Sequence, residues 1–244
     1  MAYRRRMAAL HISDEGRVRV VTFSRPEVLN AFDTSLYQGV ATALADAAVD
    51  DGVGAVVLTG EGKAFSSGQD LAEMARLASG EPGATSAFPA LLDQVTTFPK
   101  PLLAAVNGVA VGIGMTILAH CDLVLVAQGA RAKVPFGALG VAPEAASSYL
   151  FPLRMGWQRA ALALLAGDWF DAQALVDSGL ALAVYPDGQV LGEAVALGQR
   201  ISAFPLASIM AIKQLMLAGH AAAIADARAR EDQSFAVLLS GFTR

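Results

Sequence analysis

The sequence contains few of the residues that build disulfides, metal centres or aromatic binding platforms. It has one cysteine and three histidines, and aromatic residues make up 7% of it. A single cysteine cannot form an internal disulfide, and no Cys and His spacing typical of a zinc site is present. We therefore expect Cys121 to be a buried thiol, and we predict a reduced, cytoplasmic protein with no metal site.

Charged residues are also scarce, at 16%, and the net charge of −4 argues against a nucleic-acid partner. The one basic cluster, Arg4 to Arg6, is expected to be a solvated tail, and the apolar run after it is too short for a signal peptide. Residues 102–127 could be mistaken for a membrane span. Asn107, His120, Asp122 and glycines interrupt this stretch, which predicts a protein core and no membrane contact.

Apolar residues are abundant: they make up 55% of the chain, with a mean hydropathy of +0.47. Much of this content is alanine, which suits closely packed helices and an oligomer that covers additional apolar surface. A length of 244 residues is enough for one large domain, or for one domain with a small appendage.

The order of the predicted elements indicates an α/β core followed by helices. Apolar alternation and turn residues predict a hairpin over 8–24, and a helix with its cap at Asp33 or Thr34 is predicted over 34–49. Further strands are predicted over 53–59, 102–106, 122–127, 132–134 and 182–185, and helices over 71–78, 88–98, 157–166, 171–178, 190–203, 206–218 and 222–239. This order predicts a core over 1–187 and a helical C-terminal subdomain over 188–244.

The chain is organised around residues 102–122. A buried strand ends at Asn107-Gly108, Gly112 and Gly114 then flank Ile113, and a short buried helix follows. Glycines permit positive φ and close approach, and the first amides of a helix have no acceptor inside it. Two interpretations remain at this point. The glycines give clearance for tight packing, or the free amides hold a carbonyl oxygen that becomes negative.

Three motifs then resemble one family. They are Arg25-Pro26 with Asn30-Ala31, the "AFSSGQDL" of residues 64–71, and the "VNGVAVGIG" of residues 106–114 with Cys121-Asp122. In this order and spacing they resemble the crotonase (enoyl-CoA hydratase/isomerase) superfamily over nearly the whole chain. The resemblance implies an α/β fold, a spiral of ββα units with a C-terminal all-helical trimerisation subdomain. It also implies a homotrimer or hexamer and an acyl-CoA thioester ligand, with no cofactor beyond the coenzyme A of that substrate.

The resemblance also implies how the thioester is held. In the family, two backbone N–H groups bind its oxygen; here they are those of Gln69 and Ile113, and each is worth roughly 3 kcal/mol to an oxyanion. Ser66 and Ser67 are expected to shape the first turn. The substrate-binding residues implied by the motifs are Arg25, Ser66, Ser67, Gly68, Gln69, Asp70, Leu71, Gly112, Ile113 and Phe136. Lys213 is open to two interpretations, a solvated lysine or a contact to a CoA phosphate.

The acid–base residues must distinguish the reactions of the family. Enoyl-CoA hydratases carry two glutamates, and the matching positions here are Thr116 and Phe136. Between 102 and 167 the only acids are Asp122 and Glu144. Asp122 is expected to hold backbone groups at a helix–strand junction, and His120 is expected to be a satisfied core histidine.

Glu144 is a lone carboxylate among small and apolar residues. From the residues alone it is either a charge favoured by a helix dipole or a catalytic base. The stretch 135–156 is similar to the peroxisomal-type Δ3,Δ2-enoyl-CoA isomerases, in which the Glu of "PEG" is the base. This chain has Ala145 in place of the usual Gly, and it ends without a peroxisomal tripeptide, which favours a cytoplasmic location.

The resemblance therefore implies an isomerase of the type used in fatty acid β-oxidation. Glu144 would move a proton from C2 to C4 of an unsaturated acyl-CoA through an enolate. Other acyl-CoA reactions, namely hydration and thioester hydrolysis, remain alternatives, as does a non-catalytic acyl-CoA-binding relative.

Overall fold

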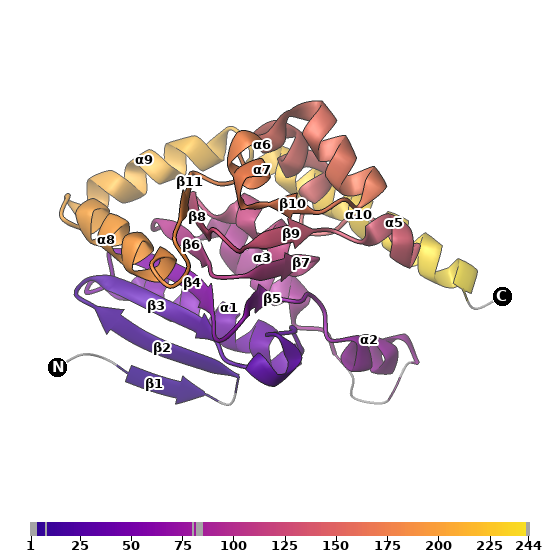
Figure 1. Cartoon of the computed structure of the whole chain (residues 1–244), viewed down its shortest axis with the longest axis horizontal. Coiled ribbons are helices and arrows are strands. Elements are labelled where there is room, and N and C mark those ends of the chain that lie inside the picture. Colours follow the sequence, from indigo (N-terminus) through magenta and orange to yellow (C-terminus); the bar gives the residue numbers. More distant parts are fainter. Residues whose placement is uncertain (1–3, 8, 80, 82–84, 243–244) are drawn as a thin grey trace.

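The computed structural model describes residues 4–7, 9–79, 81 and 85–242, and it has a mixed α/β fold with two sheets (Figure 1). The larger sheet has seven strands in the order β1-β2-β3-β4-β6-β8-β11. Pairing is antiparallel from β1 to β3 and parallel from β3 to β11. The strands are β1 Arg4–Met7, β2 Leu10–Glu15, β3 Val18–Phe23, β4 Ala55–Gly60, β6 Leu102–Val106, β8 Leu123–Ala127 and β11 Ala183–Tyr185.

The predicted hairpin and the inner strands of this sheet are confirmed. Strands β4 and β6 are continuous runs of small and branched apolar residues and are buried almost throughout, as expected for parallel strands covered on both faces. Arg4 to Arg6 were expected to form a tail, and this prediction is wrong, because their backbone forms a strand. These residues lie in β1, where Arg4 pairs with Ser13 and Met7 with Leu10 of β2.

A smaller sheet was not predicted as such. Its four strands lie in the order β10-β9-β7-β5, with bounds β5 Ala64–Ser66, β7 Val109–Val111, β9 Arg131–Lys133 and β10 Phe170–Asp171. Strands of two or three residues are too short to show an alternating pattern in the sequence. Only the region of β9 was expected to be a strand, and β5 and β7 fell inside segments expected to be turns.

The helices follow the predicted order closely. Asp33 caps α1, because its Oδ1 accepts a hydrogen bond from the Leu36 amide at 2.8 Å. Figure 1 shows α2 projecting from the body, and α10 running along the side of the molecule opposite β1. The helices are η1 Pro26–Val28, α1 Thr34–Val49, α2 Leu71–Ala78, α3 Phe88–Thr97, α4 Ile113–Thr116, η2 Ile117–His120, α5 Phe136–Leu139, α6 Ser147–Ala161, η3 Leu162–Ala166, α7 Ala172–Asp177, α8 Val190–Ser202, α9 Leu206–Ala218 and α10 Ala221–Phe242.

Helix α8 packs directly on the larger sheet, although it follows the predicted domain boundary. A Cβ added to Gly198 would lie 3.0 Å from a methyl group of Val18 in β3, so this glycine allows close packing of helix on strand. The division at residue 187 stays a prediction.

A partly buried ion pair joins helix α9 to the central stretch. The Asp122 Oδ2 accepts hydrogen bonds from the Leu102 amide at 2.7 Å and from Lys213 Nζ at 2.8 Å. Lys213 also donates to the carbonyl of Lys100 at 2.7 Å and is buried. The structural role expected for Asp122 is confirmed. Both interpretations of Lys213 are wrong, since its ammonium group is neither solvated nor free to bind a phosphate.

Within the part of the chain that the structure describes, no single helix is both long and apolar enough to cross a membrane. Taken together, α8 and α9 are long and apolar enough, and the chain bends by 106° between them.

Candidate active site

Two neighbouring turns form the centre of the candidate site. Strand β5 pairs in parallel with β7, with Ala64 opposite Val109 and Ser66 opposite Ala110. Parallel strands end at the same edge of a sheet. The turn after β5, residues 67–70, therefore lies beside the turn after β7, residues 112–114.

The backbones of these turns touch. Gly68 has a φ of +100°, and a Cβ there would lie 3.0 Å from the carbonyl oxygen of Val111. A Cβ on Gly114 would lie 2.7 Å from the carbonyl oxygen of Ser66, closer than real contacts allow. Both positions therefore require glycine, and the contact brings Gln69 and Ile113 together.

The amides of Gln69 and Ile113 are free to bind a ligand. The Gly68 carbonyl accepts from Phe32 N at 2.7 Å, so the N–H of the same peptide unit, that of Gln69, points away from Phe32. The Gly112 carbonyl accepts from the amides of Met115 and Thr116, so the N–H of Ile113 points out of the start of α4. Neither N–H has an acceptor among the described residues. Two such donors can bind one oxygen that gains negative charge.

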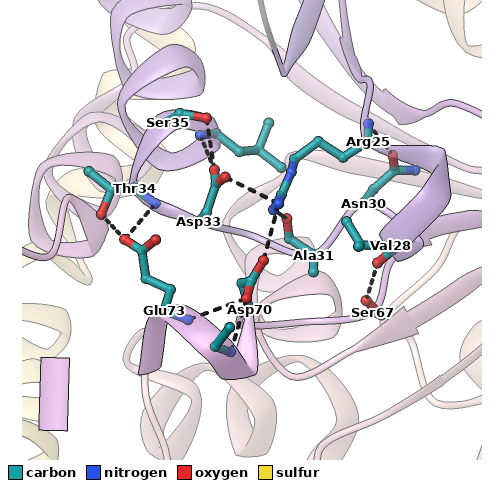
Figure 2. Close-up of polar contacts among 12 residues, drawn as sticks. Arg25, Val28, Asn30, Ala31, Asp33, Thr34, Ser35, Ser67, Asp70 and Glu73 are labelled. Carbon is teal, nitrogen blue, oxygen red and sulfur yellow. Dashed lines mark hydrogen bonds and ion pairs between the residues drawn. The ribbon is translucent and has the colours of Figure 1, made fainter. Parts of the chain in front are cut away.

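Polar contacts of Arg25 hold the first turn in place (Figure 2). Its guanidinium lies 3.3 Å from Asp33 and 3.1 Å from Asp70, and it donates to the carbonyl of Ala31 at 2.6 Å. Asp70 in turn accepts from the amides of Ala72 and Glu73 at the start of α2. Burial opposes ionisation of Asp70, but these amides and Arg25 outweigh it and lower its pKa. Arg25 is thus engaged in shaping the turn, and a contact to substrate stays a prediction.

The two serines also shape this turn, as expected. Ser66 Oγ accepts from the Gly68 amide at 3.1 Å, and Ser67 Oγ donates to the Val28 carbonyl at 3.1 Å. Leu71 is the first residue of α2 and is 67% exposed. Phe136 is buried at the start of α5, which follows β9, the neighbour of β7 in the smaller sheet.

The Glu144 side chain contacts Thr116, the last residue of α4. Its Oε1 accepts a hydrogen bond from Thr116 Oγ1 at 2.9 Å, so the residue at the hydratase position is a partner of Glu144. Burial raises the pKa of Glu144 to about 7; the Thr116 hydroxyl acts in the opposite direction, and the charge of Glu231 adds to the rise. The carboxylate bound to the amides at the start of α6 is that of Glu231, and the interpretation of Glu144 as a charge favoured by the helix dipole stays untested.

Tyr37 binds the Gln69 side chain, a contact that was not found from the sequence. Its buried hydroxyl donates to Gln69 Oε1 at 2.6 Å. Burial raises the pKa of Tyr37 well above its usual value, and the charges of Glu144 and then Glu73 add to the rise. The Glu144 carboxylate therefore lies within electrostatic range of the phenol that holds the Gln69 side chain. In the sequence, Tyr37 is indistinguishable from other core residues of an amphipathic helix.

His120 contacts the residue that follows Glu144. Its ring Nε2 lies 2.8 Å from the carbonyl oxygen of Ala145, and burial lowers the pKa of His120 to about 4. The ring is therefore neutral at pH 7, and Nε2 carries the proton that it donates to this carbonyl. The expectation of a satisfied core histidine is confirmed. Within the described ranges, no group of three or more His, Cys, Asp or Glu side chains could hold a metal ion.

Comparisons with known proteins show the family of this chain. The family model for enoyl-CoA hydratase/isomerase matches residues 13–241. A solved structure, the enoyl-CoA hydratase/isomerase from Pseudoalteromonas atlantica T6c, superimposes with a TM-score of 0.90 at 32% identity, covering 95% of this chain and 91% of that one.

Two relatives carry different activities in their names. "Enoyl-CoA delta isomerase 2" of Rattus norvegicus is 41% identical over 180 residues, which are 72% of this chain and 46% of the rat protein. The match thus spans less than half of that relative. "2,3-dehydroadipyl-CoA hydratase" of Escherichia coli K12 is 31% identical over 234 residues, 95% of this chain and 91% of that protein.

The fold and the paired turns define a crotonase-type protein. The chain belongs to the enoyl-CoA hydratase/isomerase family, and the crotonase fold expected from its motifs is confirmed.

Replacing Ile113 with proline tests the second backbone donor. Ile113 is the first residue of α4, where proline is sterically accepted but removes the N–H. We expect Ile113→Pro to lower turnover of an enoyl-CoA by at least about a hundredfold. Ile113→Ala is the control, since it removes more of the buried side chain and keeps the amide. Equal activities of two folded variants would show that this N–H does not hold the oxygen.

The raised pKa of Glu144 predicts a pH-dependent cost to stability. Its pKa in the folded protein, about 7, lies above the ordinary value of 4.5, so the folded state favours the protonated form. The contribution of Glu144 to the free energy of unfolding is therefore fully present below pH 4.5, and it is lost as the pH rises to about 7. Because one pKa unit is worth about 1.4 kcal/mol, we expect Glu144→Gln to gain roughly 1–3 kcal/mol above pH 7 and nothing below pH 4.5.

Thermal unfolding of wild type and Glu144→Gln at pH 4 and pH 8 measures this effect. Glu193→Gln is the control, because Glu193 is exposed on α8. A Glu144→Gln protein with the same melting temperature as wild type at pH 8 would contradict the raised pKa.

Proposed function

We propose that this chain is a Δ3,Δ2-enoyl-CoA isomerase in which Glu144 is the single base. The observation that supports this best is the Thr116–Glu144 hydrogen bond of 2.9 Å. A hydroxyl occupies the position at which a hydratase carries a glutamate, and it donates to the carboxylate of Glu144, which lies 28 residues further along the chain. Phe136, at the second hydratase position, cannot transfer a proton.

The reaction needs one group that takes and returns a proton. Glu144 removes a proton from C2 of the 3-enoyl chain, and the electron pair moves into the thioester to form an enolate. The amides of Gln69 and Ile113 bind the enolate oxygen. Glu144 then returns the proton at C4, which leaves the double bond between C2 and C3. A carboxyl with a pKa of about 7 is suited to both transfers at neutral pH.

The contacts of Glu144 favour this role. Thr116 binds Oε1, and the second carboxylate oxygen has no hydrogen-bond partner among the described residues. Glu73, a second carboxylate near Tyr37, accepts hydrogen bonds from the amide and hydroxyl of Thr34 at the start of α1. Glu73 is thus occupied in joining α2 to α1, which leaves Glu144 as the carboxylate available for proton transfer.

Hydration is the second candidate, because the Escherichia coli relative, which matches over nearly its whole length, is named as a hydratase. The two reactions separate with two substrates. An isomerase converts a 3-enoyl-CoA to the 2-enoyl-CoA and does not hydrate this product. A hydratase adds water to a 2-enoyl-CoA and forms a 3-hydroxyacyl-CoA.

We expect Glu144→Gln to lower isomerisation of a 3-enoyl-CoA by about 10²–10⁴-fold, while binding of a saturated acyl-CoA remains. Phe136→Leu and Thr116→Val should cost much less. The Thr116 hydroxyl lowers the pKa of Glu144, so Thr116→Val should move the acid limb of the pH–rate profile to higher pH. Isomerase activity retained in Glu144→Gln would refute the mechanism. If the wild-type protein binds both substrates and converts neither, an acyl-CoA-binding protein is favoured. If it releases free CoA, a thioesterase is favoured.

We also propose a homotrimer or a hexamer. Helix α9 exposes apolar side chains, with Ile212 at 52%, Met216 at 64% and Leu215 at 78% exposed. Contiguous exposed apolar surface is typical of an interface between subunits. We expect light scattering at micromolar concentration to give a mass that is a multiple of three subunits. A monomer mass of 25.2 kDa would contradict this.

A further inference from the structure

The loop that carries Glu144 has an unfavourable backbone. Ala145 and Ala146 follow Glu144 directly and have φ values of +57° and +55°. This left-handed region is unfavourable for a residue with a side chain, because the Cβ approaches the following carbonyl oxygen. Two such residues in succession require contacts that hold them, and helix α6 begins immediately afterwards at Ser147.

A carboxylate from the last helix supplies these contacts. Glu231 lies on α10 and is only 5% exposed. Its Oε2 accepts from the Ala146 amide at 2.7 Å, and its Oε1 accepts from the Ser148 amide at 2.8 Å. Hydrogen bonds from amides to an ionised carboxylate are stronger than neutral ones. His120 binds the Ala145 carbonyl from the opposite direction, so both sides of the left-handed pair are fixed.

We propose that Glu231 is a positioning residue for Glu144. By binding the amides of Ala146 and Ser148, it keeps the left-handed pair in the conformation that directs Glu144 toward Thr116. This inference rests on the proposed role of Glu144 as the base, and it assigns to α10 a part in the active site that the family motifs do not contain.

Glu231 also sets the charge around Glu144. Among the described residues, the titratable groups that act on Glu144 or respond to its charge are Glu231 from α10 and Tyr37 from α1, while Thr116 supplies a hydroxyl and His120 is neutral. The charge of Glu231 raises the pKa of Glu144. Burial raises the pKa of Glu231 itself, with hydrogen bonds from Ser148 and Ala146 acting against the rise and the charge of Asp232 adding to it.

Glu231→Gln separates positioning from simple stabilisation. The carboxamide has the same shape, but it has one acceptor oxygen for two N–H groups and no charge. We expect kcat for a 3-enoyl-CoA to fall roughly 10- to 100-fold, because a displacement of about 1 Å at a catalytic group has an effect of this size. Binding of a saturated acyl-CoA should stay within about twofold, and the acid limb of the pH–rate profile should move to lower pH.

Asp232→Asn is the matched control. Asp232 is the next residue of α10, is exposed, and loses the same charge when replaced. We expect wild-type kcat from this variant. A folded Glu231→Gln protein with a lower melting temperature, wild-type kcat and an unmoved acid limb would show that Glu231 only stabilises the fold, and would overturn the proposal.

Direct titration of Glu144 keeps this test independent of the reaction. Infrared difference spectra between each background and its Glu144→Gln counterpart give the titration midpoint of this carboxyl, and hydrogen exchange reports the Ala146 and Ser148 amides. We expect Glu231→Gln to lower the midpoint and to speed exchange at both amides. If wild type turns over no enoyl-CoA, the proposed function fails, and an unchanged midpoint with unchanged exchange would separately overturn the role of Glu231.

Discussion

The close approach of two backbones at Gly68 and Gly114 is the constraint on which the candidate site depends. A Cβ on Gly114 would lie 2.7 Å from the carbonyl oxygen of Ser66, which excludes it, and Gly68 combines a φ of +100° with a Cβ position 3.0 Å from the carbonyl oxygen of Val111. The parallel pairing of β5 with β7 produces this contact, and the free amides of Gln69 and Ile113 follow from it. The Arg25 contacts to Asp33 and Asp70 then keep the first turn from moving away from the second.

Much of this arrangement could be predicted because its signals are local. The strand, turn and helix around Ile113 can be identified from the apolar run and the glycines. The N-cap at Asp33 follows from a short-range hydrogen bond to the Leu36 amide. The position of Glu144 was also within reach, since a lone carboxylate in an apolar segment stands out. In contrast, Tyr37 looks like any core residue of a helix until its hydroxyl is seen on Gln69.

The missing parts all depend on contacts between distant residues. The smaller sheet has strands of two or three residues, which gain their identity only from pairing. Lys213 is separated by 91 residues from Asp122, its partner in a partly buried ion pair. From the sequence alone, a lysine in a helix is expected to be exposed to solvent. From the sequence, Glu231 is one of several charged residues on a helix that is expected to be solvated. In the structure its carboxylate binds the amides at the start of α6, next to Glu144 in the sequence.

The contact between Glu231 and Ala146 also bears on how the protein is made. These residues are 85 positions apart, and synthesis proceeds from the N-terminus. When the β5 and β7 turns have already left the ribosome and can pair, the left-handed Ala145–Ala146 pair still lacks its carboxylate. The conformation of the Ala145–Ala146 pair therefore depends on a residue that is synthesised 85 positions later.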